Sequence, residues 1–382
     1  MEKENSKRKN NIEMFIFIAA IYIVVLILEM TVRSTSILFT VLRKGAIYSL
    51  VAVSMNLLNG FTGLFSLGQA GFMLLGAYTY GILTMPSSVK EGTSVYRYYE
   101  ALIKFDTGIF VGLIAAGLVA ALFAAVIGLP VLRLKSDYLA IATLGFAEII
   151  RAVCQWDVLG PITNGANMIR SYKDLTSIRI PFTDISFPPT LFIFIVVGIC
   201  IAIIVMLINS SYGRAFKAIR DDEVAAEAMG INLFRHKELS FVISSFFAGI
   251  SGALLAMFQY TVQASQFKTS MTYELLLIVV IGGIGSISGS CIASFLYIAL
   301  SEWWLRGLDM GSFLGIKAET LFRSGFRRLV FSLAIMVIVL FFSKGLMGDK
   351  ELSFQRIGAR IKGIGSHLKR NGRRRADDGK HS

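Results

Sequence analysis

The sequence SSYGRAFKAIRDDEVAAEAMG, from Ser210 to Gly230, separates two long apolar runs, Leu191–Ile208 and Leu239–Met257. Its charged residues lie too close together for hydrocarbon, where each charge costs at least about 2.5 kcal/mol at the bilayer centre; they are Arg214, Lys217, Arg220, Asp221, Asp222 and Glu223. We therefore interpret residues 209–238 as a water-facing loop between two membrane spans and call it the charged loop. Its alanines and closing glycine predict a short helix that a soluble partner can contact.

The composition is typical of a protein that crosses the membrane several times. Of 382 residues, 55% are hydrophobic and 16% are charged, against about 25% charged in soluble domains. The mean hydropathy is +0.66. The net charge of +13 fits the accumulation of Lys and Arg on cytoplasmic loops and tails, so we do not expect nucleic-acid binding. The basic tail is also suited to contact with anionic lipids of the bilayer.

The residues that build metal, disulfide or catalytic sites are sparse. The three cysteines include no CxxC pair, and His236, His367 and His381 all fall in polar loop or tail sequence. The sequence has no GxxxxGK[ST] phosphate-binding loop, so we do not expect this chain to hydrolyse ATP. We therefore expect no catalytic residues, no metal and no cofactor bound by this chain.

The apolar runs predict an all-α integral membrane fold, a polytopic bundle of about ten helical spans. The predicted spans are 12–30, 37–59, 66–85, 108–129, 138–153, 190–208, 239–259, 272–284, 287–305 and 326–342. The basic N-terminus (1–11) predicts a cytoplasmic start, and alternation then places the charged loop and the C-terminus inside as well. The expected organisation is a basic N-terminus, a membrane domain at 12–348 and a basic cytoplasmic tail at 349–382 that is disordered.

Two decisions determine this span count. The apolar run Ile12–Leu28 follows basic residues as in a signal peptide, but it is long and no small-x-small cleavage site follows, so we expect a retained span. Residues 272–305 fit either one long helix or two short ones broken at GGIGSISG, residues 282–289. We expect two helices, because four glycines in eight residues weaken a helix by about 1 kcal/mol each.

A second glycine-rich stretch, NGFTGLFSLGQAGFMLLGAY at 59–78, predicts a helix that breaks and a new helix that begins. Its small residues serve either close helix packing or a water-filled path lined by irregular backbone. GLFSLG at 63–68 resembles GIGSISG at 283–289, and matching interrupted helices often line a transport path. The candidate path residues are Gly60, Gly63, Ser66, Gly68, Gln69, Phe72, Gly282, Gly283 and Gly285.

Glu148 is a further candidate path residue, because an ionisable group inside a span is a functional candidate by default. We favour the simpler interpretation that it pairs with Arg151, three residues later on the same helix, near the outer edge. We expect few other mid-span charges, with Glu29 and Glu274 near span ends. This scarcity argues against a proton-coupled carrier.

Together, the charged loop, the glycine-rich third span and the TLGFAE sequence at 143–148 resemble the membrane subunits of branched-chain amino-acid ABC importers, specifically the M-type permease. The matching stretches are 45–78, 132–151, 211–256, 278–289 and 344–348. They occur in this order and span most of the chain from 45 to 348.

The resemblance implies an ABC permease fold in a bacterial cytoplasmic membrane and a subunit of an ATP-driven importer of leucine, isoleucine or valine. It implies a second, homologous permease that shares the translocation path, two cytoplasmic ATPase subunits that hold ATP and Mg²⁺, and an external solute-binding protein.

The charged loop matches the coupling motif Glu-Ala-Ala-x-x-x-Gly of such importers, except that Val224 occupies the Glu position and Glu223 precedes it. The resemblance therefore implies ATPase coupling through Arg214, Arg220, Asp221, Asp222, Glu223, Ala225, Ala226 and Gly230.

Three alternatives remain at this point. Similar permeases carry urea or short amides, so the solute could also belong to that class. A secondary transporter would depend on an ion gradient instead of an ATPase, and a membrane scaffold or enzyme would carry no solute.

Overall fold

The computed structural model describes residues 19–31, 36–91, 95–96, 98–134, 136–178, 187–304, 312–313, 316–317, 333, 336 and 345–348. The chain forms two compact units, one from Met1–Thr31 with Glu351–Ser382 and the other from Val32–Lys350. In the smaller unit an apolar helix covers Ala19–Thr31, within the last part of the predicted first span and one residue beyond it. The predicted tail and the predicted span at 326–342 lie outside the described residues, apart from single positions.

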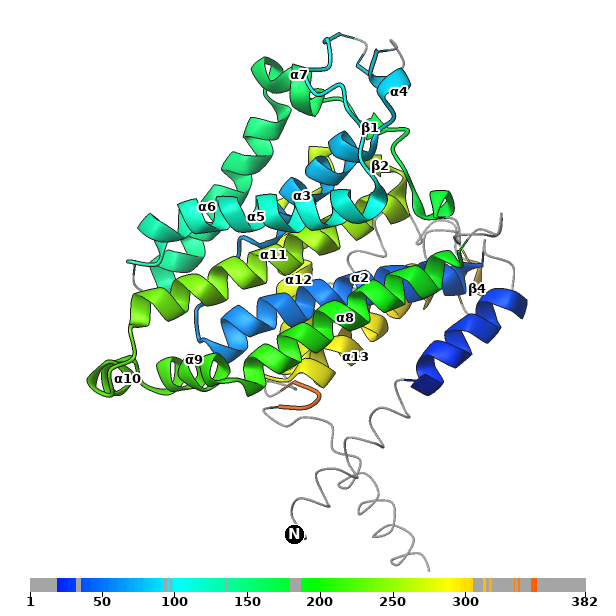
Figure 1. Ribbon diagram of the computed structural model, residues 1–382. Helices are drawn as coiled ribbons and strands as arrows, with labels where there is room; N and C mark the ends of the chain where they lie inside the picture. The colour runs from blue at the N-terminus through cyan, green and yellow to red at the C-terminus, as the bar shows by residue number, and fades with distance from the viewer. Residues whose placement is uncertain are drawn as a thin grey trace, which may run out of the picture. The chain divides into compact units, whose positions relative to one another are not determined.

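The larger unit is built from helices (Figure 1). The longer ones are α2 (Ile37–Asn56), α3 (Gln69–Thr84), α5 (Ile109–Val131), α6 (Ser136–Gln155), α8 (Pro189–Asn209), α9 (Ser211–Asp221), α11 (Leu233–Gln259), α12 (Thr269–Gly282) and α13 (Ile287–Ile298). Two π-helical segments continue α2 and α13, namely η1 (Leu57–Phe61) and η5 (Ala299–Trp304).

Short elements complete the larger unit. They are α4 (Ser87–Glu91), η2 (Asp157–Leu159), α7 (Gly160–Thr163), η3 (Leu175–Ser177), α10 (Glu223–Ala228) and η4 (Ala264–Gln266). Two antiparallel strand pairs are present. Strand β1 (Ile169–Arg170) pairs with β2 (Thr261–Val262), and β3 (Ser312–Phe313) pairs with β4 (Ile316–Lys317).

Each span predicted between 37 and 305 coincides with a helix, and five of these helices are long and apolar enough to cross a membrane. The predicted start of α11 at 239 is wrong, because the helix begins at Leu233. The Asn232 side chain accepts a hydrogen bond from Arg235 N at 3.0 Å and so caps an N-terminal turn that is polar. Hydropathy marks the apolar part of a helix and misses such an extension.

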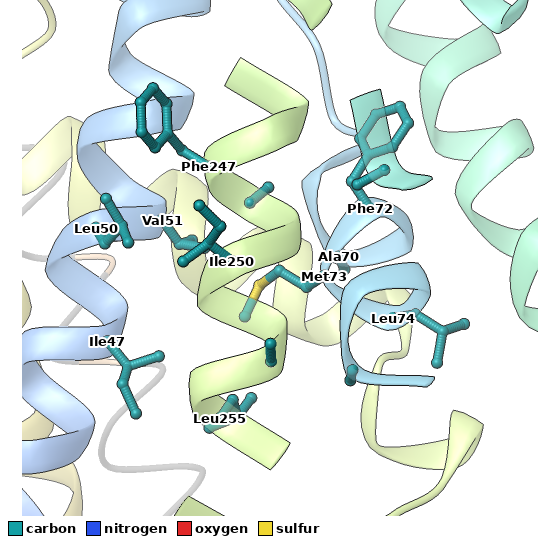
Figure 2. Packing of buried hydrophobic residues seen from close by; sticks show 14 of the residues in the cluster. Ile47, Leu50, Val51, Ala70, Phe72, Met73, Leu74, Phe247, Ile250 and Leu255 are labelled. Atoms are coloured by element: carbon teal, nitrogen blue, oxygen red, sulfur yellow. The ribbon is translucent and has the colours of Figure 1, made fainter. Parts of the chain in front are cut away.

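Helix α11 lies at the centre of the larger unit and packs against α5, α3 and α2. Figure 2 shows α11 between α2 and α3, with Val51, Ile250 and Met73 filling the space between these helices. Glycines bring the backbones together: a Cβ added to Gly249 would lie 2.7 Å from Ala116 O of α5. The small residues of these helices therefore serve close packing in this region.

The segments that join α3 to α5 and α6 to α8 are tied together by hydrogen bonds. Tyr96 Oη donates to Ile162 O at 2.8 Å, and Tyr99 Oη donates to Asp157 Oδ1 at 2.9 Å. Lys173 Nζ pairs with Asp106 Oδ2 at 2.8 Å. The positive charge and hydrogen bond of Lys173 hold the pKa of the Asp106 carboxyl below its usual value. These side chains therefore give the connecting segments a fixed structure at one end of the helices.

Candidate functional site

The charged loop folds as two helices, α9 and α10, with Asp222 between them. Asp222 is extended, and its Oδ1 accepts from Val224 N at 2.9 Å and Ala225 N at 3.0 Å, which caps α10. At the other end, Gly230 has φ +83° and donates to Glu227 O at 2.9 Å. The predicted short helix with a closing glycine is therefore confirmed: Asp222 caps its start, and Gly230 follows its end in the left-handed region.

Helix α9 is amphipathic and holds the charged loop onto the bundle. Gly213, Phe216 and Ile219 are buried, and α9 packs against α8, α11 and η1. The Phe216 ring meets the His236 ring of α11 edge-on, with centroids 6.4 Å apart. These contacts give the loop a rigid base, which an ordinary solvated loop lacks.

Helix α10 presents apolar groups to solvent. Val224 is 77% exposed and Met229 is 83% exposed, whereas Ala226 is buried. Ala225 is exposed in this chain, so of the two motif alanines Ala226 packs inward and Ala225 faces out. Glu223 pairs with Lys237 of α11 at 2.7 Å. An exposed apolar face on a firmly based short helix is suited to bind a protein partner.

Arg220 joins the charged loop to the first of the two glycine-rich breaks, which lies between α2 and α3. Its Nη1 donates to Gly60 O at 3.2 Å, while Nε and Nη2 bond Asp221 Oδ1 at 3.1 and 2.9 Å. Gly63 has φ +76°, and a Cβ there would lie 3.0 Å from Arg220 Cγ. The Lys217 ammonium lies 5.6 Å from the centre of the Phe61 ring. A movement of α9 would therefore displace η1, the π-helical segment that continues α2.

The first break runs from η1 through 62–68, which is not helical, to α3. Asn59 Oδ1 accepts from Ser66 N at 3.1 Å, and Thr143 Oγ1 of α6 accepts from Leu67 N at 2.9 Å. These side chains satisfy backbone groups that the break frees, as irregular backbone among membrane helices requires. The predicted break is confirmed, although α3 begins at Gln69 and not at Ser66.

The second break separates α12 from α13 and confirms the prediction of two helices. Gly283 has φ +109° and Gly285 has φ +91°, conformations that favour glycine. Ser286 Oγ accepts from Gly289 N at 3.1 Å and caps α13. The turn at 345–348 packs against the C-terminal end of α12, where Leu346 N donates to Ile281 O at 2.7 Å.

The two breaks are in contact, and Asn56 joins them. Its Nδ2 donates to Ser286 O at 2.9 Å and Ser290 Oγ at 2.8 Å, and its Oδ1 accepts from Gly285 N at 2.8 Å. A Cβ added to Gly60 would lie 2.5 Å from Gly285 N. The structure therefore brings together Gly60, Gly63, Gly283 and Gly285 of the candidate path with Arg220 of the charged loop.

The remaining candidate path residues have different surroundings. Gly282 packs against the backbone of Gly289, and Gly68 against Thr143. The Phe72 ring meets Phe241 of α11 edge-on, with centroids 5.5 Å apart.

Glu148 belongs to a separate contact at the start of α12. Its Oε2 accepts from Arg151 Nε at 2.6 Å, and its Oε1 accepts from Thr269 N at 3.2 Å and from Thr269 Oγ1. The Arg151 pair that we favoured from the sequence is present, and the bond to α12 was not anticipated. This arrangement ties α6 to α12 and satisfies the carboxylate.

Further ionisable residues lie inside the helices, so the expectation that mid-span charges are scarce is wrong. Lys44, eighth residue of α2, pairs with Glu302 of η5 at 2.5 Å, and Arg43 Nε donates to Thr190 Oγ1 of α8 at 2.8 Å. The apolar residues of α2 on both sides keep the mean hydropathy of the segment high, so a hydropathy average does not show these charged residues. Asn56, Asn59 and Thr143 were also missed, because nothing local marks a polar residue that bonds a distant backbone.

Among the described residues, no group of three or more His, Cys, Asp or Glu side chains is arranged to hold a metal ion. The charged loop and the two breaks instead combine rigid helix, helix interruptions and a protein-binding face. Such an arrangement can transmit movement from a bound protein into a membrane bundle.

Comparison with known proteins identifies the family. Residues 37–344 match the family described as "Branched-chain amino acid transport system / permease component". The high-affinity branched-chain amino acid transport system permease proteins LivM of Escherichia coli (strain K12) and Salmonella typhimurium (strain LT2) are each 32% identical over 278 residues. That match covers 67% of this chain and 61% of each relative, so the chain spans about three fifths of their length.

Two archaeal relatives come from Methanocaldococcus jannaschii. The probable branched-chain amino acid transport permease protein LivM is 24% identical over 344 residues, which is 84% of this chain and 95% of the relative. The probable permease protein LivH is 25% identical over 268 residues, 69% of this chain and 79% of the relative. No solved structure matches the chain.

The family and these relatives are described as transport permease components, which are transporter subunits and not enzymes. The apolar helices agree with a multi-pass membrane protein. The chain therefore belongs to the family of permease components of branched-chain amino acid transport systems.

Proposed function

We propose that this chain is the membrane permease subunit of an ATP-driven importer for leucine, isoleucine and valine, in a bacterial cytoplasmic membrane. In this proposal both chain ends and the charged loop face the cytoplasm. A second, homologous permease completes the path, two ATPase subunits bind ATP and Mg²⁺, and an external solute-binding protein delivers the amino acid. The likeness to both LivM and LivH relatives supports a second permease of the same kind.

The observation that carries the proposal is the contact between the charged loop and the helix breaks. The exposed face of α10 offers a docking surface for an ATPase subunit, and α9 connects that surface to the end of α2 through Arg220 and Gly60. Closure of the ATPases around ATP would push on α10, and α9 would carry the displacement to both breaks. Interrupted helices are suited to respond, because their backbone is not held by a continuous hydrogen-bond ladder.

Uptake by the assembled complex tests this function. The chain would be reconstituted in vesicles with its partner permease, ATPases and binding protein, and the uptake of radiolabelled leucine would be measured with and without ATP. We expect uptake that requires ATP and persists when ionophores collapse proton and sodium gradients. Uptake that needs a gradient and no ATP would identify a secondary transporter, and competition by urea or acetamide would identify the alternative solutes.

A variant of the charged loop tests the coupling role. Gly230→Pro cannot adopt φ +83° and removes the N–H that bonds Glu227 O. We expect this variant, and the double replacement of Asp221 and Asp222 by Lys, to insert normally but to hydrolyse ATP without matching uptake. Normal uptake by both variants would refute the coupling role of the charged loop.

A further inference from the structure

Gln69 carries a buried hydrogen-bond acceptor to which none of the described residues donates. It is the first residue of α3, directly after the non-helical segment 62–68, and its side chain is fully buried. Its Nε2 donates to Ser244 Oγ of α11 at 2.8 Å. Its Oε1 is buried and has no hydrogen-bond partner among the described residues.

The neighbouring hydrogen bonds fix which end of the Gln69 amide is unpaired. Ser244 Oγ donates its single proton to Ser54 O of α2 at 2.6 Å. It can therefore only accept from Gln69, so the amide nitrogen must face Ser244. The opposite orientation would place two oxygens together without a proton between them. The unpaired atom is thus the carbonyl oxygen, an acceptor.

An unpaired acceptor at this depth is unfavourable, since a buried carbonyl loses its bonds to water and gains nothing in return. A methionine would fill a similar volume without that cost. The unpaired oxygen therefore suggests that a ligand donates a hydrogen bond to it during transport. The donor must be small enough to enter a closely packed interface and must carry N–H or O–H groups.

The surroundings of Gln69 combine a polar contact with an aromatic one. Phe72 and Phe241 pack edge-on with centroids 5.5 Å apart, and each lies three residues from Gln69 or Ser244 on the same helix face. Ser244 lies eleven residues after Leu233, so it is about 16 Å along α11, which has 27 residues. The site is therefore near the middle of the bundle, next to an interrupted helix, where transporters of other folds bind their substrates.

We propose that Gln69 Oε1 accepts a hydrogen bond from the α-ammonium group of the transported amino acid as it passes α3 and α11. An ammonium group is a donor only, so it matches a lone carbonyl acceptor. Phe72 and Phe241 lie one helical turn from Gln69 and Ser244, so the position adjoins buried aromatic side chains. This inference rests on the proposed function and assigns one contact within the path.

The test uses the complete reconstituted complex and radiolabelled leucine. Gln69→Met removes the acceptor, Ser244→Ala removes the amide's partner but keeps Oε1, and Gln259→Met makes the same exchange at the end of α11. We expect Gln69→Met to lower kcat/KM for leucine uptake roughly 10- to 100-fold, as for loss of a hydrogen bond to a charged group. Gln259→Met should stay within about threefold of the parent, and Ser244→Ala, which frees the amide to turn but leaves Oε1 in place, should lower uptake less than Gln69→Met.

If the parent imports leucine but Gln69→Met has an unchanged kcat/KM, the inference is overturned and the proposed function stands. If Gln69→Met and Ser244→Ala lose uptake and Tm to the same extent, Gln69 is only a structural tie and the inference is again overturned. If the parent complex imports no leucine with ATP, the proposed function itself fails.

Discussion

Replacing Arg220 by alanine should separate ATP hydrolysis from solute movement. Arg220 forms the hydrogen bond by which the charged loop reaches the end of α2, from Nη1 to Gly60 O at 3.2 Å. Without it, α9 still packs through Phe216 and Ile219, so the loop should fold and bind its partner. A displacement of α9 would then reach Gly60 less completely.

The size of the effect follows from this contact. A hydrogen bond from a charged donor is worth about 1.5–3 kcal/mol, but the Arg220 side chain is 38% exposed and water can replace part of the bond. We therefore expect a loss of about 1–1.5 kcal/mol of coupling free energy. That loss corresponds to a fivefold to tenfold fall in leucine molecules imported per ATP hydrolysed.

The assay measures ATP hydrolysis and leucine uptake in the same vesicles. Arg235→Ala is the control, because Arg235 is exposed near the start of α11 and its side chain makes no hydrogen bond or ion pair within the described residues. Asp221→Asn tests the neighbouring ion pair alone. The reasoning is refuted if Arg220→Ala keeps the parental ratio, or if Arg235→Ala lowers it equally while all complexes assemble.

Three further outcomes are expected. Gly60→Ala should lower the Tm and the yield of assembled complex, because the added Cβ would lie 2.5 Å from Gly285 N in the second break. Such overpacking costs about 1–3 kcal/mol. Gly145→Ala is the control and should be neutral or stabilising in the same melting assay, because a Cβ there meets nothing within 4 Å. Glu148→Gln should assemble with at most a mild loss of leucine uptake, since its main contacts are to Arg151 and Thr269; complete loss of flux with intact assembly would place it on the path. The lowered pKa of Asp106 means that its carboxylate stabilises the fold above its unfolded pKa of about 4 and loses this effect as pH falls through the lower folded value. Asp106→Asn should therefore lower the Tm at pH 7, and this effect should shrink as the pH falls through the folded pKa; a Tm shift that does not change with pH would contradict this.

Much of the fold followed from hydropathy and glycine placement. The apolar runs located the helices between 37 and 305, and the glycines at 60, 63 and 282–289 located both breaks. These features are local, because helix length and backbone flexibility depend on neighbouring residues. Capping of α10 by Asp222 and its end at Gly230 were predictable for the same reason.

The contacts between the breaks could not be predicted in this way. Asn56 lies inside an apolar helix and looks like an isolated polar residue, yet it bonds groups about 230 positions away in the sequence. The ion pair between Lys44 and Glu302 likewise forms only when folding brings α2 and η5 together. Such pairings depend on which helices become neighbours, and periodicity within one helix carries no information about that.

The amide of Asn56 limits how the bundle can change shape. Because it donates to two partners beyond Gly285 and accepts from Gly285 itself, separating the C-terminal end of α2 from the start of α13 would break several bonds at once. Motion that carries both segments as one body would break none of them. We therefore expect the bundle to open by a rigid-body rotation of α2 and α13 against α3 and α11. Residues 283–290 would move together with α2.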